Sequence, residues 1–110
     1  MTTEQIINKV MKTDYYTTSN AHVQYKSVNG SLSVALHFNF DMDTNVANGH
    51  VAWINVTPSA RKLSIETSID HKRINCKTTR DMIAAEINQA TAKLVNAFNQ
   101  AKGGNSYKTN

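Results

Sequence analysis

The segment AHVQYKSVNGSLSVALHFNF, residues 21–40, predicts a β-hairpin and with it a sheet-based fold. Apolar and polar residues alternate on both sides of Asn29-Gly30, as they do in strands with one buried face. Asn-Gly is a preferred two-residue hairpin turn, because both positions need positive φ. On the apolar face this turn pairs Tyr25 with Val34, Val23 with Leu36 and Ala21 with Phe38. On the other face it pairs Lys26 with Ser33, Gln24 with Ala35 and His22 with His37.

A second hairpin is expected at residues 50–70, where HVAWINV and RKLSIETSID flank Pro58-Ser59. A four-residue loop at 57–60 pairs Ile54 with Leu63 and Ala52 with Ile65, so one face of this hairpin is apolar. The opposite face carries Val51 and Trp53. Trp53 is therefore a candidate for base stacking or partner contact, unless the N-terminal helix or a second subunit covers it.

Helices are expected on either side of these strands. Residues 3–13 carry the apolar stripe Ile6, Ile7, Val10 and Met11 after a possible capping box of Thr2 and Gln5. Residues 79–102 follow a predicted N-cap at Thr78, with Asp81 as its box partner, and precede a C-cap glycine at Gly103. The apolar stripe of this long helix consists of Ile83, Ile87, Ala90, Leu94, Ala97 and Ala101, with Met82 and Phe98 beside it.

The predicted fold class is α+β. A short N-terminal helix precedes a four-stranded antiparallel meander sheet, and a long C-terminal helix packs on that sheet. The 110 residues form a single domain over 1–102, and the linker-like tail GGNSYKTN at 103–110 is expected to be disordered. One cysteine excludes an internal disulfide and fits a reducing compartment. No signal peptide or apolar span is recognisable, so we expect a cytoplasmic protein with no membrane contact.

The sequence contains only weak motifs for metal binding or catalysis. The segment DMDTN resembles a calcium loop, but Val46 and Ala52 replace its glycine and its bidentate glutamate. A facing His22–His37 pair would supply too few ligands for zinc. Cys76 with His71 has no third group to orient the histidine, and Cys76 is interpreted as a small half-buried residue. We therefore expect no catalytic residue, no metal, no cofactor and no enzymatic activity.

The segment HKRINCKTTRD, residues 71–81, gathers His71, Lys72, Arg73, Lys77 and Arg80 at the start of the long helix. With a net charge of +4, the chain favours acidic partners. Free N–H groups at a helix start together with cations can bind phosphate, although a solvated loop neutralised by Asp70 and Asp81 is the alternative. The predicted nucleic-acid-binding residues are Lys72, Arg73, Lys77, Arg80 and Lys62. The predicted partner or stacking residues are Trp53 and Phe98.

Residues 49–101 resemble one known family. GHVAWINV, RKLSIETSID and MIAAEINQATAKL are similar to the second and third strands and the C-terminal helix of the YbaB/EbfC-type nucleoid-associated proteins. The matching helix positions are Ile83-Ala84-Ala85, Asn88, Ala90, Lys93 and Leu94. The resemblance implies a small dimeric α+β protein that binds DNA with little sequence preference. The chain departs from that family in its short first helix and in the extra strand supplied by the hairpin at 21–40.

Two functions fit these features. The first hypothesis is a small non-enzymatic nucleic-acid-binding protein, a homodimer that contacts the DNA or RNA backbone through residues 71–80 with little sequence specificity. The alternative is a protein-binding inhibitor or adaptor, such as a small phage-type protein that blocks a host defence complex. Phosphate-driven binding weakens steeply with salt, which separates the two hypotheses.

Overall fold

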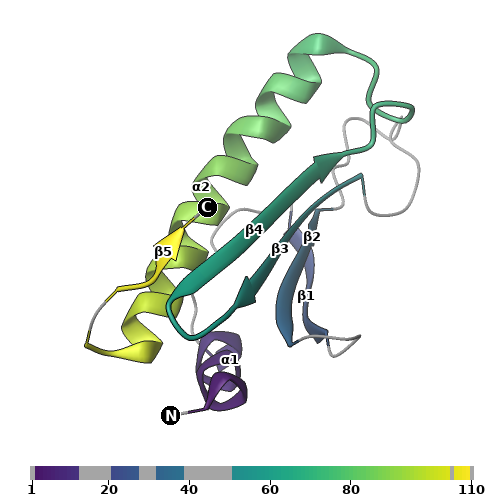
Figure 1. Ribbon diagram of the computed structural model, residues 1–110. Helices are drawn as coiled ribbons and strands as arrows, with labels where there is room; N and C mark the ends of the chain where they lie inside the picture. Colours follow the sequence, from purple (N-terminus) through teal and green to yellow (C-terminus); the bar gives the residue numbers. More distant parts are fainter. Residues whose placement is uncertain (1, 13–20, 28–31, 39–50, 105, 110) are drawn as a thin grey trace.

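The computed structural model describes residues 2–12, 21–27, 32–38, 51–104 and 106–109, and for residues 21–27 the backbone alone. The elements in chain order are α1 (Thr3–Lys12), β1 (Ala21–Ser27), β2 (Ser33–Phe38), β3 (Ala52–Pro58), β4 (Lys62–Ile69), α2 (Lys77–Lys102) and β5 (Lys108–Thr109). One sheet runs in the order β1-β2-β3-β4-β5, and α2 lies along it (Figure 1). The predicted α+β class, with its short first helix, four-stranded meander and long last helix, is confirmed. The parallel pairing of β5 with β4 makes the sheet mixed rather than purely antiparallel.

The core lies between the two helices and one face of the sheet. Alternation along β3 buries Ala52, Ile54 and Val56, while the residues between them are half-buried or exposed. Across the sheet, Leu36 of β2 is the partner of Ile54. The same core cluster includes residues of both helices: Ile6, Ile7, Val10, Ile83, Ile87, Ala90, Leu94, Ala97 and Phe98. Because α1 and α2 share this cluster, the other face of β3 and β4, called here the outer face, has no helix of the described chain packed on it.

Both helices begin with recognisable local chemistry. At α1 the predicted capping box is confirmed, because Thr2 N–H donates to Gln5 Oε1 (2.8 Å) and Gln5 N–H donates to Thr2 Oγ1 (3.2 Å). At α2 the predicted cap is wrong: the helix starts at Lys77, and its N-cap is Cys76. Asp81 accepts a bond from Lys77 Nζ instead of supporting a cap at Thr78. In the described part of the chain, neither helix combines the length and apolar composition of a membrane span.

The β1–β2 register differs from the prediction by one residue. Ala21 pairs with Phe38 as expected, but Val23 pairs with His37 and Tyr25 with Ala35. An irregularity between Ala21 and Val23 absorbs the difference, as a β-bulge does. The predicted pairs of residues 23–26 are therefore wrong, and so is the facing of His22 and His37. The turn at Asn29-Gly30 lies outside the described residues.

The β3–β4 register differs from the prediction by four residues. Ile54 pairs with Thr67 rather than Leu63, and Pro58 pairs with Leu63. The turn is tighter than expected, because Ser59 N–H donates to the Lys62 carbonyl (2.8 Å). Pro58 is tolerated at the strand end, beyond the last pair between β2 and β3, where no backbone N–H is needed. Since four is an even shift, the predicted faces survive although the predicted pairs do not.

Val51 is the exception to the face assignment. We expected it beside Trp53 on the outer face, but it is fully buried. It precedes β3, and its backbone bonds to both neighbours: Val51 N–H donates to the Phe38 carbonyl (3.0 Å), and its carbonyl accepts from Asp70 N–H (2.7 Å). A residue outside the regular strand does not follow the two-residue alternation, so the expectation fails there.

The tail differs most from its prediction, because residues 106–109 pack on the domain. Gly103 caps α2 and, like Gly104, has a φ of 67°, a conformation that glycine adopts without strain. Tyr107 N–H donates to Asn99 Oδ1 (2.8 Å), and the Tyr107 ring meets Phe98 edge-on at 6.2 Å. Lys102 Nζ lies 4.1 Å above the same ring. These contacts, which linker-like composition does not reveal, direct β5 to the edge of β4.

Replacing Tyr107 by alanine tests this packing. Tyr107 is buried, so Tyr107→Ala should lower the free energy of unfolding by about 1.5–3 kcal/mol, the cost of losing one large apolar side chain. Urea denaturation measures the change. The control is Ser106→Ala at the neighbouring exposed position, which should leave the midpoint within error. Equal midpoints for the two variants would show that the tail does not dock.

Candidate nucleic-acid interface

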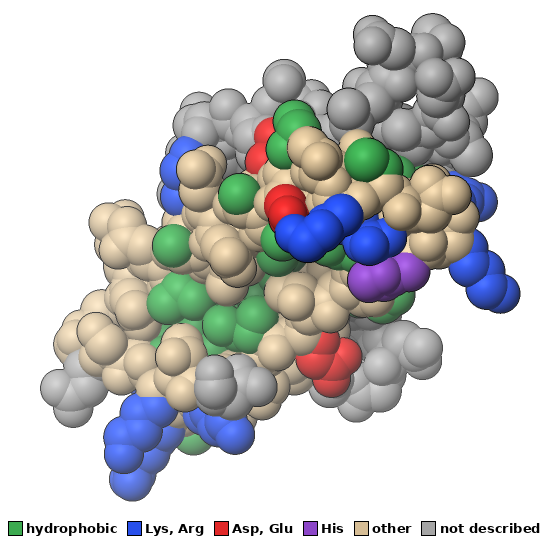
Figure 2. Space-filling view, turned by 90° about the horizontal axis from the view of Figure 1, so that it is seen from above, with side chains coloured by type: hydrophobic (Ala, Val, Ile, Leu, Met, Phe, Trp, Pro, Cys, Tyr) green, Lys and Arg blue, Asp and Glu red, His purple; other side chains and the backbone are tan. Residues whose placement is uncertain are grey.

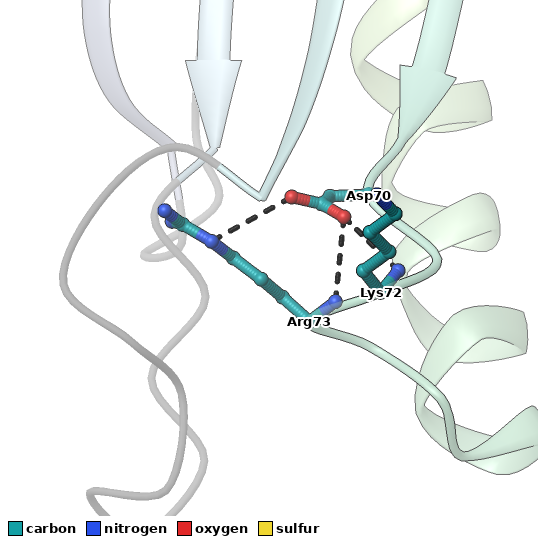
Figure 3. Close-up of polar contacts among 3 residues, drawn as sticks. All are labelled: Asp70, Lys72 and Arg73. Atoms are coloured by element: carbon teal, nitrogen blue, oxygen red, sulfur yellow. Dashed lines mark hydrogen bonds and ion pairs between the residues drawn. The ribbon is translucent and has the colours of Figure 1, made fainter.

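The basic segment forms a compact turn between β4 and α2, at the end of the sheet away from β5 (Figure 1). Asp70 organises it: Oδ1 accepts from Lys72 N–H (3.0 Å) and Arg73 N–H (3.3 Å), as Figure 3 shows. The Asp70 carbonyl accepts from Ile74 N–H (2.9 Å). An aspartate at this position satisfies backbone donors that would otherwise need water. The turn therefore holds its cations on a defined backbone.

The four cations of this turn differ in their availability. Lys72 is exposed. Arg73 Nε lies 3.6 Å from Asp70 Oδ2, and Lys77 Nζ lies 2.7 Å from Asp81 Oδ2, both in solvent-exposed ion pairs. Such pairs are worth little, so a phosphate can replace the carboxylate. Arg80 is half-buried and donates from Nη1 to the Ile74 carbonyl (3.2 Å), which ties the first turn of α2 to the loop. The name basic turn is used below for Lys72, Arg73 and Lys77.

Lys62 does not join the basic turn. It lies at the first position of β4, and the basic turn follows the last one. Eight residues of strand separate the two sites by about 25 Å. Figure 2 shows the Lys and Arg side chains of one face in separate groups, with polar and hydrophobic surface between them. Of the predicted nucleic-acid-binding residues, Lys62 therefore lies on a different surface from those of segment 71–80.

Lys62 instead lies beside two cations that are not among the predicted binding residues. Lys108 is its partner across the parallel β4–β5 pair, and Lys108 N–H donates to the Arg61 carbonyl (2.9 Å). Arg61, Lys62 and Lys108, all exposed, are called the tail cluster below. The signal in the sequence was Tyr107, a large aromatic residue in a segment that otherwise has the composition of a linker.

The two predicted partner residues have opposite environments. Trp53 is 40% exposed on the outer face, where its neighbours across the sheet are His37 and Ser68. Phe98 is fully buried under Tyr107, so its assignment as a partner residue is wrong. Its apolar ring is covered by the docked tail rather than by a second subunit. Met82, by contrast, is exposed on α2.

A shallow groove of about 360 Å³ lies between the second half of β4 and α2. Its described lining combines small, polar and apolar side chains and carries a single titratable group, His71. This is too little for paired acid–base chemistry. The lining residues are Thr67, Ser68, Ile69, His71, Ala84, Ile87 and Asn88.

Metal binding finds no support in the geometry. Across the described residues, no three side chains of His, Cys, Asp or Glu gather at one point. The residues of the calcium-like loop, Asp41, Asp43 and Asn45, lie outside the described part, and of His22 only the backbone is described. The structure therefore adds no reason to expect a metal.

Cys76 lies next to the basic turn and is exposed, so its interpretation as half-buried is wrong. It occupies the N-cap of α2 in an extended conformation (φ −88°, ψ 125°). Hydrogen bonds from the backbone and then the side chain of Thr79, with a smaller effect of Thr78, favour the thiolate. They hold the pKa of Cys76 below its ordinary value. A lowered pKa increases the fraction of thiolate, and its consequence is enhanced thiol reactivity.

Comparison with known proteins adds nothing to this geometry. No family model matches the chain, and no curated protein or solved structure is significantly similar to it. The resemblance to the YbaB/EbfC-type proteins therefore stays a prediction.

Alkylation of Cys76 tests the local field at the start of α2. Because the folded state favours the thiolate, the pH midpoint of the iodoacetamide reaction should lie lower in native protein than in urea-unfolded protein. Thr79→Val removes the side-chain donor and should raise the native midpoint part of the way. Identical midpoints in native and unfolded protein would contradict the assignment. Asn88→Ala, farther along α2, serves as the control.

Proposed function

We propose that the protein binds nucleic acid without catalysis, and that the basic turn contacts the phosphate backbone with little sequence specificity. The observation that carries the proposal is the placement of Lys72 and Arg73 on a turn organised by Asp70, with Lys77 following at the first position of α2. Their acidic partners within the described chain are Asp70, which is half-buried, and Asp81, which is exposed. A backbone phosphate carries one negative charge, as a carboxylate does. Binding to a row of phosphates also releases condensed counterions, so exchange of partners favours the polyanion.

The start of α2 adds to this arrangement. Its first turn contains no acidic residue before Asp81, and its N-cap Cys76 makes no side-chain capping bond. The helix dipole favours negative charge there, and the backbone N–H groups of Thr78 and Thr79 already favour the Cys76 thiolate. Arg80 fixes the turn against the helix by its bond to the Ile74 carbonyl. The proposal therefore assigns contact to Lys72, Arg73 and Lys77 and support to Arg80.

A protein-binding inhibitor or adaptor is the second candidate. The exposure of Trp53 favours it, because tryptophan is enriched at protein interfaces. The argument for the predicted homodimer is weaker, because Val51 and Phe98 are buried within one chain. Dimerisation stays a prediction, which light scattering over a dilution series measures directly.

Alanine substitution of Lys72, Arg73 and Lys77 together tests the proposed function. Loss of three phosphate contacts should weaken DNA binding and reduce the slope of log K against log salt by up to about three. Fluorescence polarisation of a labelled duplex at several salt concentrations provides the measurement. Because the three side chains are exposed, the melting temperature should stay unchanged.

The matched control replaces Lys9, Lys12 and Lys93, three exposed lysines of α1 and α2, by alanine. It lowers the net charge by the same amount but leaves the basic turn intact. Equal loss of affinity in both variants would show that the effect comes from net charge alone and not from the basic turn. Unchanged affinity in the basic-turn variant would exclude its role in binding.

A further inference from the structure

The tail cluster concentrates positive charge, and no carboxylate of the described residues forms an ion pair with it. Lys62 and Lys108 are direct partners across the β4–β5 pair, and Arg61 precedes Lys62 in the turn. Asp70 and Asp81, which pair with Arg73 and Lys77, lie at the other end of β4. No described carboxylate lies within ion-pair distance of Arg61, Lys62 or Lys108.

Like charges directly opposite on neighbouring strands destabilise a sheet. The tail nevertheless docks in this position, held by Tyr107 against Phe98 and Asn99. Lys102 strengthens the same corner, because its Nζ lies above the Tyr107 ring and donates to the Ala60 carbonyl (3.1 Å). Tail docking therefore brings a third cation to two existing ones, an arrangement that an external polyanion would stabilise.

The outer face connects this cluster with Trp53. Lys62 and Ser68 both belong to the outward-facing set of β4, and Ser68 is the partner of Trp53. Six residues of strand separate Lys62 from Ser68, a distance of about 20 Å. The surface between them carries the side chains of Asn55, Thr57, Ser64 and Glu66. All but Glu66 are neutral hydrogen-bonding groups.

We propose that the outer face binds single-stranded nucleic acid, with phosphates on the tail cluster and a base stacked on Trp53. The inference rests on the proposed function and adds a second surface and a strand preference. A single strand is indicated because stacking on a side chain needs a base that is free of its neighbours, which a duplex does not offer. Such sites combine two elements: cations that follow the nucleic-acid backbone, and an aromatic side chain on which a base stacks.

Glu66 gives the proposal a specific consequence. Its exposed carboxylate lies between the tail cluster and Trp53, where a bound strand would bring its phosphates close. Glu66→Gln removes the repulsion without changing size, so it should raise affinity for a single strand. A mere solvated sheet face would show no effect of this substitution.

The experiment compares a labelled oligothymidine with a duplex of equal length, by fluorescence polarisation and by the emission of Trp53, the single tryptophan of the chain. The single strand should quench Trp53. Trp53→Ala should weaken its binding roughly five- to hundredfold, and Trp53→Phe should restore most of it. Replacing Arg61, Lys62 and Lys108 by alanine should weaken it roughly tenfold or more. The same variant should reduce the salt slope by about two, at 0.7 per phosphate.

Tyr107→Ala provides a variant that keeps every cation. It releases β5 from its place, so it should reduce single-strand affinity as much as Lys108→Ala does. A melting curve confirms that the domain is still folded. Retention of full affinity in Tyr107→Ala would overturn the role of the docked tail. Unquenched Trp53 with full affinity in Trp53→Ala would assign that residue to another partner, such as a protein, and overturn the inference.

The basic-turn variant, with the same loss of three charges, separates the two proposals. If it alone loses affinity and the tail-cluster variant does not, the proposed function stands and this inference fails. If the tail-cluster and Trp53 variants lose affinity and the basic-turn variant does not, the inference stands and the basic turn is excluded. A wild-type protein that binds neither oligonucleotide overturns both.

Discussion

Burial of the α2 stripe against one face of the sheet is the constraint on which the rest of the structure depends. The helix runs 26 residues along β4 and β3 and contributes Ile83, Ile87 and Leu94 to a core shared with Ile54 and Leu36. A helix of about 39 Å spans nearly the whole long axis of 44 Å. On the face covered in this way, α1 fills part of the same layer, because its apolar residues belong to the same core. The outer face is left to contact solvent or a partner.

The sequence predicted the faces of the strands better than their pairing. Alternation alone decides which residues face the core, and Ile54, Leu63 and Leu36 are buried as the pattern requires. Pairing depends on the position of the turn and on the regularity of the strands. A bulge in β1 and the inclusion of Pro58 in β3 both change it. The error of four residues between β3 and β4 preserved the faces because it was even. The register shift of one residue between β1 and β2 is odd, and it changed the predicted pairs of residues 23–26.

The candidate sites show the same difference: features that are local in sequence were predictable, and features that join distant residues were not. The basic turn is local in sequence, so its cations and its place before α2 were predictable from residues 71–80. The partners that modulate it were only partly predictable: Asp70 and Asp81 were expected to neutralise it, but the bond from Arg80 to Ile74 needed the fold. The tail cluster joins residues far apart in the chain. Nothing in GGNSYKTN except Tyr107 indicates that Lys108 would lie beside Lys62.

The two basic surfaces also differ in the field they produce. Two cations of the basic turn form ion pairs with Asp70 and Asp81, and the field of a close pair falls off faster than that of a single charge. The charges of Arg61, Lys62 and Lys108 have no such compensation in the described chain, so they act as one concentrated positive charge. At physiological salt this field extends about 8 Å before it is screened. Under the proposed binding, a polyanion would meet uncompensated charge at the tail cluster, whereas at the basic turn it would displace Asp70 and Asp81 from Arg73 and Lys77.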